Sequence, residues 1–207
     1  MYNNRLRIID LNEIIALNVS KHLIRYGSID EYDNEYIYLG VYLISSLITK
    51  SCLLLVTSII LSLTEKVFIM AVIFLLIRFF SSGLHMKSSI SCTITSLVFY
   101  LGGSFIADRI SLSNEICLVF LLILGSIIVR YSPADTEKRP ILGVDKRKAL
   151  QIKSGIAVVT IIIINILLGS NIVFKLTTVV YLFQMISVIP ITYRIMNENY
   201  NNYLNYK

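Results

Sequence analysis

A histidine and a cysteine seven residues apart are the side chains of this sequence best suited to covalent chemistry. The chain has only two His and three Cys, so few such pairs exist. His85 and Cys92 lie in the segment SSGLHMKSSISCTITS, with Arg78 and Lys87 close in sequence. A thiol near an imidazole and two cations has the ingredients of a reactive thiolate nucleophile.

Helix geometry excludes the simplest form of that pair. Seven residues of unbroken helix separate two side chains by about 10.5 Å along the axis, too far for a hydrogen bond. A catalytic dyad therefore requires a turn between His85 and Cys92, which the small residues at 81–83 and 88–89 permit. The alternative is a histidine at a membrane surface and a cysteine packed as a small hydrophobe, as we expect for the other two cysteines. If a helix starts near Cys92, the backbone N–H groups of Ser91 and Cys92 are candidates for an oxyanion hole.

A second candidate region is the stretch RYSPADTEKRPILGVDKRKALQIK, residues 130–153. Asp135 and Glu137 are followed there by Lys138 and Arg139. One interpretation is a topology anchor attracted to anionic lipids, and the other is an electrostatic grip on an acidic peptide or lipid headgroup. Composition does not separate the two. Metal binding is not expected, because the His and Cys residues lack the spacing of zinc ligands.

The composition places these residues in a membrane protein. Of 207 residues, 56% are hydrophobic and only 15% are charged, and the mean hydropathy is +0.73. A soluble domain of this length could not hide so much apolar surface from water, which excludes a soluble enzyme. A disordered chain and a disulfide scaffold are excluded too. We interpret the net charge of +6 as a topology signal and expect no nucleic-acid partner.

Apolar runs predict an all-α integral membrane protein with about six transmembrane or membrane-embedded helices. About 20 apolar residues span the hydrocarbon core, although two of these runs are short for a full crossing. The runs lie at residues 40–63, 67–81, 90–107, 115–131, 154–170 and 172–191.

The distribution of positive charge predicts the orientation. Fifteen of the 19 Lys and Arg residues lie in the N-terminal part, the second and fourth connections and the tail, and only two in the connections that alternate with them. By the positive-inside rule, both termini and the second and fourth connections are cytoplasmic. We expect one polytopic domain over residues 1–207. Its parts are an amphipathic interfacial helix (1–27), a helical bundle (29–191), a basic cytoplasmic loop (130–153) and a cytoplasmic tail (192–207).

The two candidate regions together resemble the AgrB family, the membrane peptidases of Gram-positive quorum sensing. The first region is similar to the family signature R-x3-G-G-x-H-x6-C, with Ser82 in place of the first glycine. Its other positions are Arg78, Gly83, His85 and Cys92. The segment SPADTEKRPI (132–141) is similar to the family's PADTENKP-type loop. The motifs lie in the expected order, so the resemblance covers essentially the whole chain.

This resemblance implies a cysteine endopeptidase of a Gram-positive cell membrane. It would cut the C-terminal tail from an AgrD-type amphipathic propeptide through a thioester intermediate and close the product into a thiolactone or lactone ring. Cys92 would be the nucleophile and His85 its base, at the cytoplasmic side of the membrane. The supporting residues would be Arg78 and Gly83, and the substrate-binding residues Lys138, Arg139, Asp135 and Glu137. Asp135 and Glu137 are also candidates for orienting His85.

The expected partners are the propeptide, membrane lipid and a possible second copy of the chain, with no cofactor. The pairs Gly102–Gly103 and Gly125–Ser126 offer small-residue surfaces for close helix approach. The competing interpretation is a small membrane transporter or peptide exporter without proteolytic activity. Lys50 and Lys175 favour it, because charges inside apolar runs often mark a pathway. Snorkelling or pairing within the bundle is the simpler interpretation of both lysines.

Overall fold

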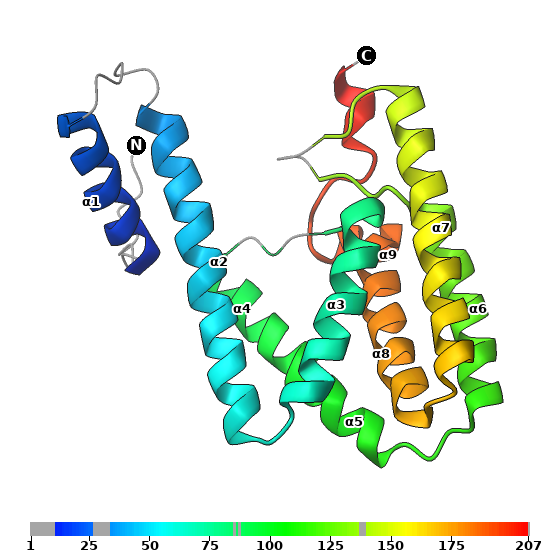
Figure 1. Ribbon diagram of the computed structural model, residues 1–207. Coiled ribbons are helices and arrows are strands. Elements are labelled where there is room, and N and C mark those ends of the chain that lie inside the picture. The colour runs from blue at the N-terminus through cyan, green and yellow to red at the C-terminus, as the bar shows by residue number, and fades with distance from the viewer. Residues whose placement is uncertain (1–10, 27–33, 85, 87, 137–139, 207) are drawn as a thin grey trace. The chain divides into compact units, whose positions relative to one another are not determined.

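Helices make up all the regular structure in the described part of the chain. The computed structural model describes residues 11–26, 34–84, 86, 88–136 and 140–206 (Figure 1). Five helices there are long and apolar enough to cross a membrane, at Tyr36–Ile60, Ser89–Arg109, Asn114–Tyr131, Val144–Leu168 and Asn171–Val188. The all-helical class predicted from the apolar runs is thus confirmed, with five candidate spans in the described residues where about six were predicted.

The predicted run at 67–81 forms the helix α3 (Thr64–Ser81), which is not among those five. Glu65, Lys66 and Arg78 give this 18-residue helix three charges. A charged helix in an apolar bundle must pair or solvate those charges, and α3 does so at both ends: Lys66 binds Asp108 at 2.5 Å, and Arg78 lies in the site described below.

The chain divides into two compact units, Met1–Ile60 and Leu61–Lys207. In the first unit, α1 (Leu11–Tyr26) packs along α2 (Asn34–Ile60), and the Thr49 hydroxyl donates a 2.9 Å hydrogen bond to Asn12 Oδ1. Asn12 and Ala16 are buried, whereas Ile14 and Leu17 are exposed. The amphipathic interfacial helix predicted at 1–27 stays a prediction, and its residues 1–10 and 27 lie outside the described part.

In the second unit, α8 (Asn171–Val188) is the central helix and packs against α3, α5 (Gly103–Arg109) and α6 (Asn114–Tyr131). Its buried residues include Leu176, Val180 and Tyr181, and the Tyr181 hydroxyl donates to the Val158 carbonyl oxygen at 2.8 Å. The elements of this unit after α3 are α4 (Ser89–Leu97), the π-helix η2 (Val98–Gly102), α5 (Gly103–Arg109), α6 (Asn114–Tyr131), α7 (Val144–Leu168), α8 (Asn171–Val188), α9 (Pro190–Ile195) and the 3-10 helix η3 (Asn202–Tyr206).

Two of the small-residue positions bring helices together within the chain. A Cβ at Gly103 would lie 2.8 Å from Met70 Cε, and one at Gly125 would lie 2.7 Å from Val158 Cγ1. Such distances exist only where the side chain is missing, so these glycines allow close packing of the bundle. The close helix approach expected from the sequence is thus confirmed at Gly103 and Gly125.

The second and fourth connections meet the tail at one end of the second unit (Figure 1). The Gly83 N–H donates to the Ala134 oxygen at 2.9 Å, and the Ala134 N–H donates to the Ser81 oxygen at 3.0 Å. The Lys66–Asp108 pair lies at the opposite end, between the start of α3 and the end of α5. This arrangement is consistent with the charge distribution, which predicts that the two connections and the tail share one side.

Candidate functional site

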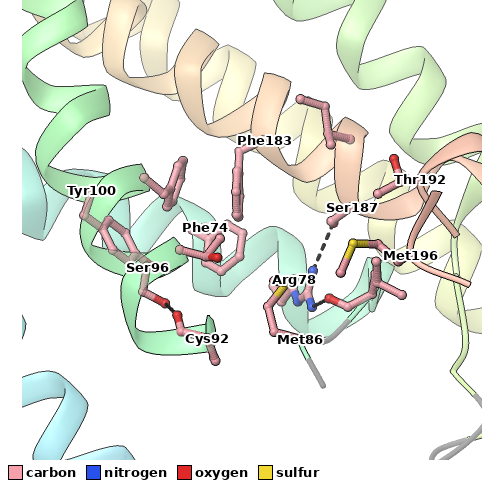
Figure 2. Close-up of a pocket in the computed structure, with 14 residues that line it drawn as sticks. Phe74, Arg78, Met86, Cys92, Ser96, Tyr100, Phe183, Ser187, Thr192 and Met196 are labelled. Atoms are coloured by element: carbon pink, nitrogen blue, oxygen red, sulfur yellow. Dashed lines mark hydrogen bonds between the residues drawn. The ribbon is translucent and has the colours of Figure 1, made fainter. Parts of the chain in front are cut away.

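A pocket of about 290 Å³ lies beside Cys92 at the end of the bundle where the connections meet (Figure 2). Its walls come from α3, the segment after α3, the α4–η2 helix, α8 and the residues around α9. Most of the lining is apolar, and Arg78 is the single charged residue among the described residues that line it. The pocket thus joins a thiol, a guanidinium and an apolar wall.

The chain breaks its helical course between positions 85 and 92, as a dyad would require. The helix α3 ends at Ser81 and α4 begins at Ser89, so the intervening described residues belong to no helix. His85 itself lies outside the described residues. Its neighbours on both sides, Leu84 and Met86, line the same pocket as Cys92.

Cys92 lies in the first turn of α4. Ser88 caps this helix by accepting a 3.1 Å hydrogen bond from the Ser91 N–H, and the Cys92 N–H donates to the Ser88 oxygen at 3.1 Å. The two N–H groups that the sequence suggested for an oxyanion hole are therefore used by the cap.

One face of the α4–η2 helix forms the part of the pocket wall that follows Cys92 in the sequence. Thr95, Ser96, Phe99 and Tyr100 follow Cys92 at intervals of three and four residues, and all of them line the pocket. Residues with this spacing share a helix face. Figure 2 shows Ser96 and Tyr100 succeeding Cys92 along the helix.

Arg78 holds the segment after α3 in place. Its Nη1 donates to Ser187 Oγ at 2.9 Å, and its Nη2 donates to the carbonyl oxygens of Gly83 at 3.2 Å and Leu84 at 2.6 Å. The Leu84 N–H in turn donates to the Ser187 oxygen at 2.9 Å. These bonds link α3 and α8 to the residue directly before position 85, so Arg78 acts on the backbone here.

Gly83 has a backbone conformation and a location that exclude a side chain. Its φ is +126°, and a Cβ would lie 2.8 Å from both Arg78 Nη1 and Ser187 Oγ. Only glycine adopts such a φ at little cost. The glycine of the motif thereby permits the Arg78 hydrogen bonds.

Sequence reasoning missed two polar residues of α8. Gln184 Nε2 donates to Ser81 Oγ at 2.5 Å and to the Ser82 oxygen at 2.9 Å, and Ser187 is the partner of Arg78. Gln184 is fully buried and Ser187 nearly so. Their spacing of three residues inside the apolar run 172–191 was the available signal, because polar side chains in such runs generally face partners within the bundle.

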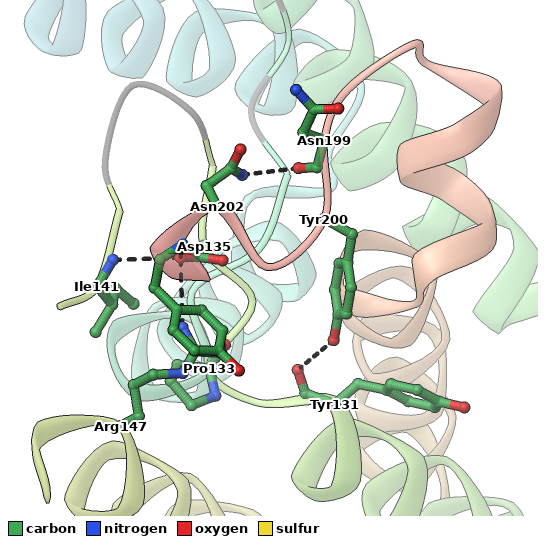
Figure 3. A network of polar contacts seen from close by, with 9 residues as sticks. Tyr131, Pro133, Asp135, Ile141, Arg147, Asn199, Tyr200 and Asn202 are labelled. Carbon is green, nitrogen blue, oxygen red and sulfur yellow. Dashed lines mark hydrogen bonds and ion pairs between the residues drawn. The ribbon is translucent and has the colours of Figure 1, made fainter. Parts of the chain in front are cut away.

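Asp135 is the centre of a polar network between the fourth connection and the tail (Figure 3). Its Oδ2 lies 3.3 Å from Arg147 Nη1 and accepts hydrogen bonds from the Tyr203 N–H at 3.1 Å and the Ile141 N–H at 3.4 Å. The Arg147 guanidinium also stacks 3.8 Å from the Tyr203 ring centroid and donates to the Pro133 oxygen at 3.1 Å.

This placement corrects the expectation for Asp135. Its side chain is completely buried and its charge is neutralised by Arg147, so it is not available to bind a substrate peptide. Arg147, one of the basic residues of the 130–153 stretch, has a structural partner here. The other three predicted substrate-binding residues, Glu137, Lys138 and Arg139, lie outside the described residues.

Two tyrosines extend the contact between tail and bundle. The Tyr200 hydroxyl donates to the Tyr131 oxygen at 3.3 Å, and the rings of Tyr193 and Tyr200 meet edge to face at 5.1 Å. Burial raises the pKa of the Tyr200 phenol, so it remains a protonated donor at neutral pH. Burial also raises the pKa of Tyr193.

The two lysines that favoured a transporter are half-buried in separate units. Lys50 lies in α2 and Lys175 in the first turns of α8. Among the residues that the structure describes, no cluster of His, Cys, Asp or Glu could hold a metal ion.

Comparisons with known proteins agree on one family. A family model described as accessory gene regulator B matches residues 15–188. A putative AgrB-like protein of Clostridium acetobutylicum is 28% identical over 95% of this chain and 92% of its own length. One from Listeria innocua is 35% identical over 65% of this chain and 66% of its own, and the accessory gene regulator protein B of Staphylococcus intermedius is 34% identical over 44% and 48%. No solved structure is significantly similar.

Proposed function

Because the chain belongs to the AgrB family, we propose that it is a membrane cysteine endopeptidase acting on an AgrD-type propeptide, with Cys92 as nucleophile and His85 as its base. The observation that carries this proposal is the shared pocket: Cys92 and both neighbours of position 85, Leu84 and Met86, line one cavity at the end of the bundle. A nucleophile and a base must lie within reach of one substrate bond.

In the first step, the Cys92 thiolate attacks the backbone carbonyl carbon at the cleavage site. The C–N bond breaks, His85 gives a proton to the departing amine, and the N-terminal part of the propeptide is left as a thioester on Cys92. The C-terminal tail leaves as a free amine.

In the second step, a thiol or hydroxyl within the bound propeptide attacks this thioester. A new thiolactone or lactone bond forms, the bond to Cys92 breaks, and the proton lost by the attacking group returns to the Cys92 sulfur through His85. With an attacking thiol, one thioester replaces another, so the step is close to energetic balance and water must be excluded. The largely apolar pocket wall next to Cys92 serves that purpose.

The remaining motif residues support the site in this proposal. Arg78 and Gly83 fix the backbone before position 85, and Lys138 and Arg139 bind the acidic C-terminal part of the propeptide. The amphipathic N-terminal part of the propeptide lies in the cytoplasmic membrane surface.

The test is co-expression with the AgrD-type propeptide encoded beside the gene, followed by mass spectrometry of the released tail. Wild type should release the tail and carry a thioester-linked fragment on Cys92. We expect Cys92→Ala and His85→Ala to abolish release. The matched controls Cys52→Ala and His22→Ala should release it as wild type does.

Release that survives Cys92→Ala would overturn the peptidase. The transporter interpretation, with Lys50 in its pathway, would then come first. Loss of release in Cys52→Ala as well would indicate that cysteine replacement acts through folding and would remove Cys92 as the assigned nucleophile.

A further inference from the structure

We propose that the pocket beside Cys92 is a specificity site for a large apolar side chain, carried by the substrate residue whose carbonyl Cys92 attacks. This inference rests on the proposed function and extends it to the chemistry of the substrate. The pocket is defined by its contact with Cys92 and by a wall formed mainly of Phe74, Phe99, Phe183, Met86 and Met196.

Covalent geometry restricts which part of the substrate can occupy this pocket. In the thioester, the α-carbon of the acyl residue is two bonds from the Cys92 sulfur. The side chain of that residue therefore has to lie next to Cys92, where the pocket is the adjoining cavity. Residues farther along the propeptide can lie elsewhere, but this one cannot.

The wall consists of aromatic rings that fix one another. Phe99 and Phe183 stack at a centroid distance of 4.0 Å, and Phe74 lies 5.4 Å from Phe99 and 5.7 Å from Phe183. Such a cluster forms a pre-organised apolar surface. Met86 and Met196 complete the lining with flexible thioethers that adapt to the shape of an apolar guest.

Arg78, the charged residue among the described lining residues, does not make the pocket a site for acidic side chains. Arg78 donates three hydrogen bonds to Ser187, Gly83 and Leu84, and its guanidinium carbon lies 5.7 Å from the Phe74 ring centroid. A carboxylate would have to be desolvated and to compete with these bonds. The apolar wall therefore determines which substrate side chain the pocket prefers.

Thr95 is the residue expected to limit the size of the guest. It lies about one helical turn after Cys92 on the pocket face of α4, and its side chain is short. A larger residue there would occupy the volume that the guest needs. Thr93, two positions earlier on the same helix, is also half-buried but does not line the pocket, which makes it a matched control.

The experiment measures covalent labelling of Cys92 in the purified chain in lipid vesicles. The probes are N-acetyl aminoacyl chloromethyl ketones carrying Phe, Leu, Ala or Asp, whose chloride is displaced by the thiolate to form a thioether. Peptide mapping by mass spectrometry gives the labelling rates of Cys92 and Cys52. Cys52 is exposed on the apolar helix α2, within a candidate span, so its labelling reports the partition of the apolar probes into the membrane.

We expect the Cys92:Cys52 rate ratio to be at least about tenfold higher with the Phe or Leu probe than with the Ala probe, and lower again with Asp. Thr95→Phe should remove about tenfold of the Phe preference over Ala, and thermal unfolding in detergent verifies that this variant is folded. Thr93→Phe should behave as wild type.

Equal ratios for the four probes, or a preference for Asp, would overturn the specificity site whatever the variants do. If that result accompanied Cys92-dependent release of the propeptide tail, the pocket assignment alone would be wrong. Selective labelling of Cys92 by apolar probes without any propeptide cleavage would instead contradict the proposed peptidase and leave the pocket chemistry intact.

Discussion

At the scale of single residues, the site depends on a guanidinium and on a missing side chain beside it. Arg78 bonds the Gly83 and Leu84 carbonyl oxygens and Ser187, and Gly83 leaves the space through which the Ser187 bond passes. Ser82, which stands where the family has another glycine, also has a positive φ, of 56°. With a ψ of −140°, Ser82 lies outside the left-handed helical region, in a conformation that residues with a Cβ rarely adopt, so position 82 is strained as well.

We predict that Gly83→Ala lowers stability by roughly 1–3 kcal/mol, the cost of a strained backbone, and reduces tail release. The added Cβ would displace Arg78 or Ser187, each 2.8 Å away. Thermal unfolding in detergent and the release assay measure the two effects. Gly102→Ala is the control, because nothing lies within 4 Å of its Cβ position. Wild-type stability and release in Gly83→Ala would show that the close approach is not maintained.

Arg78→Lys should also lose tail release although the charge is kept. An ammonium group cannot form the forked set of bonds to Ser187, Gly83 and Leu84 at once. If the role of Arg78 is only electrostatic, the lysine variant will retain most of the activity, and the positioning role assigned here will be wrong.

At the scale of elements, the tail is fastened to the fourth connection, which pairs with the segment leading to position 85. This contact is formed by Asp135, Arg147 and Tyr203. Next to Asp135, Ala134 forms backbone hydrogen bonds with Ser81 and Gly83. The second motif of the sequence therefore supports the first through main-chain contacts. A disturbance of the tail should reach the pocket by this route.

We predict that Arg147→Gln costs about 3–5 kcal/mol of stability, because it leaves the buried Asp135 carboxylate without its cation. Thermal unfolding should show a lowered Tm, and tail release should fall. Lys146→Gln and Lys148→Gln are matched controls, since both side chains are exposed and flank Arg147. An equal fall in Tm in all three variants would mean that the loss of positive charge matters and that the Arg147–Asp135 pair does not.

At the scale of the whole molecule, the second unit has two chemically different ends. The connections and the tail gather at one end, and the Lys66–Asp108 pair marks the other. The positive-inside rule assigns the first end to the cytoplasm. The proposed site would then meet a propeptide made inside the cell.

This orientation predicts the accessibility of single cysteines introduced at exposed positions. In intact cells, a membrane-impermeant maleimide should label Ser111→Cys but not Leu142→Cys or Asn199→Cys. The last two should react only after permeabilisation, and the unmodified chain gives the background of the native thiols. All three residues are exposed in the structure. Labelling of Leu142→Cys from outside would reverse the orientation.

The sequence by itself determined the helical membrane class and the candidate nucleophile. Apolar runs of this length must form helices because the bilayer offers no partner for free backbone groups. Cys92 and Gly83 were identifiable because their motif is local, with fixed spacing along the chain. The limits of α3 and the break before α4 followed from the same local signals to within a few residues.

Only the tertiary structure decided which polar groups meet across the bundle. Gln184 and Ser187 contact α3 and the residues just after it over about a hundred positions of sequence, and Asp135 binds Arg147 and Tyr203 instead of a substrate. Local periodicity shows which face of a helix is apolar, but not which helix lies against it. Partner choice in a bundle depends on the packing of all its helices, since a buried donor or charge pairs with whatever acceptor the fold brings within reach.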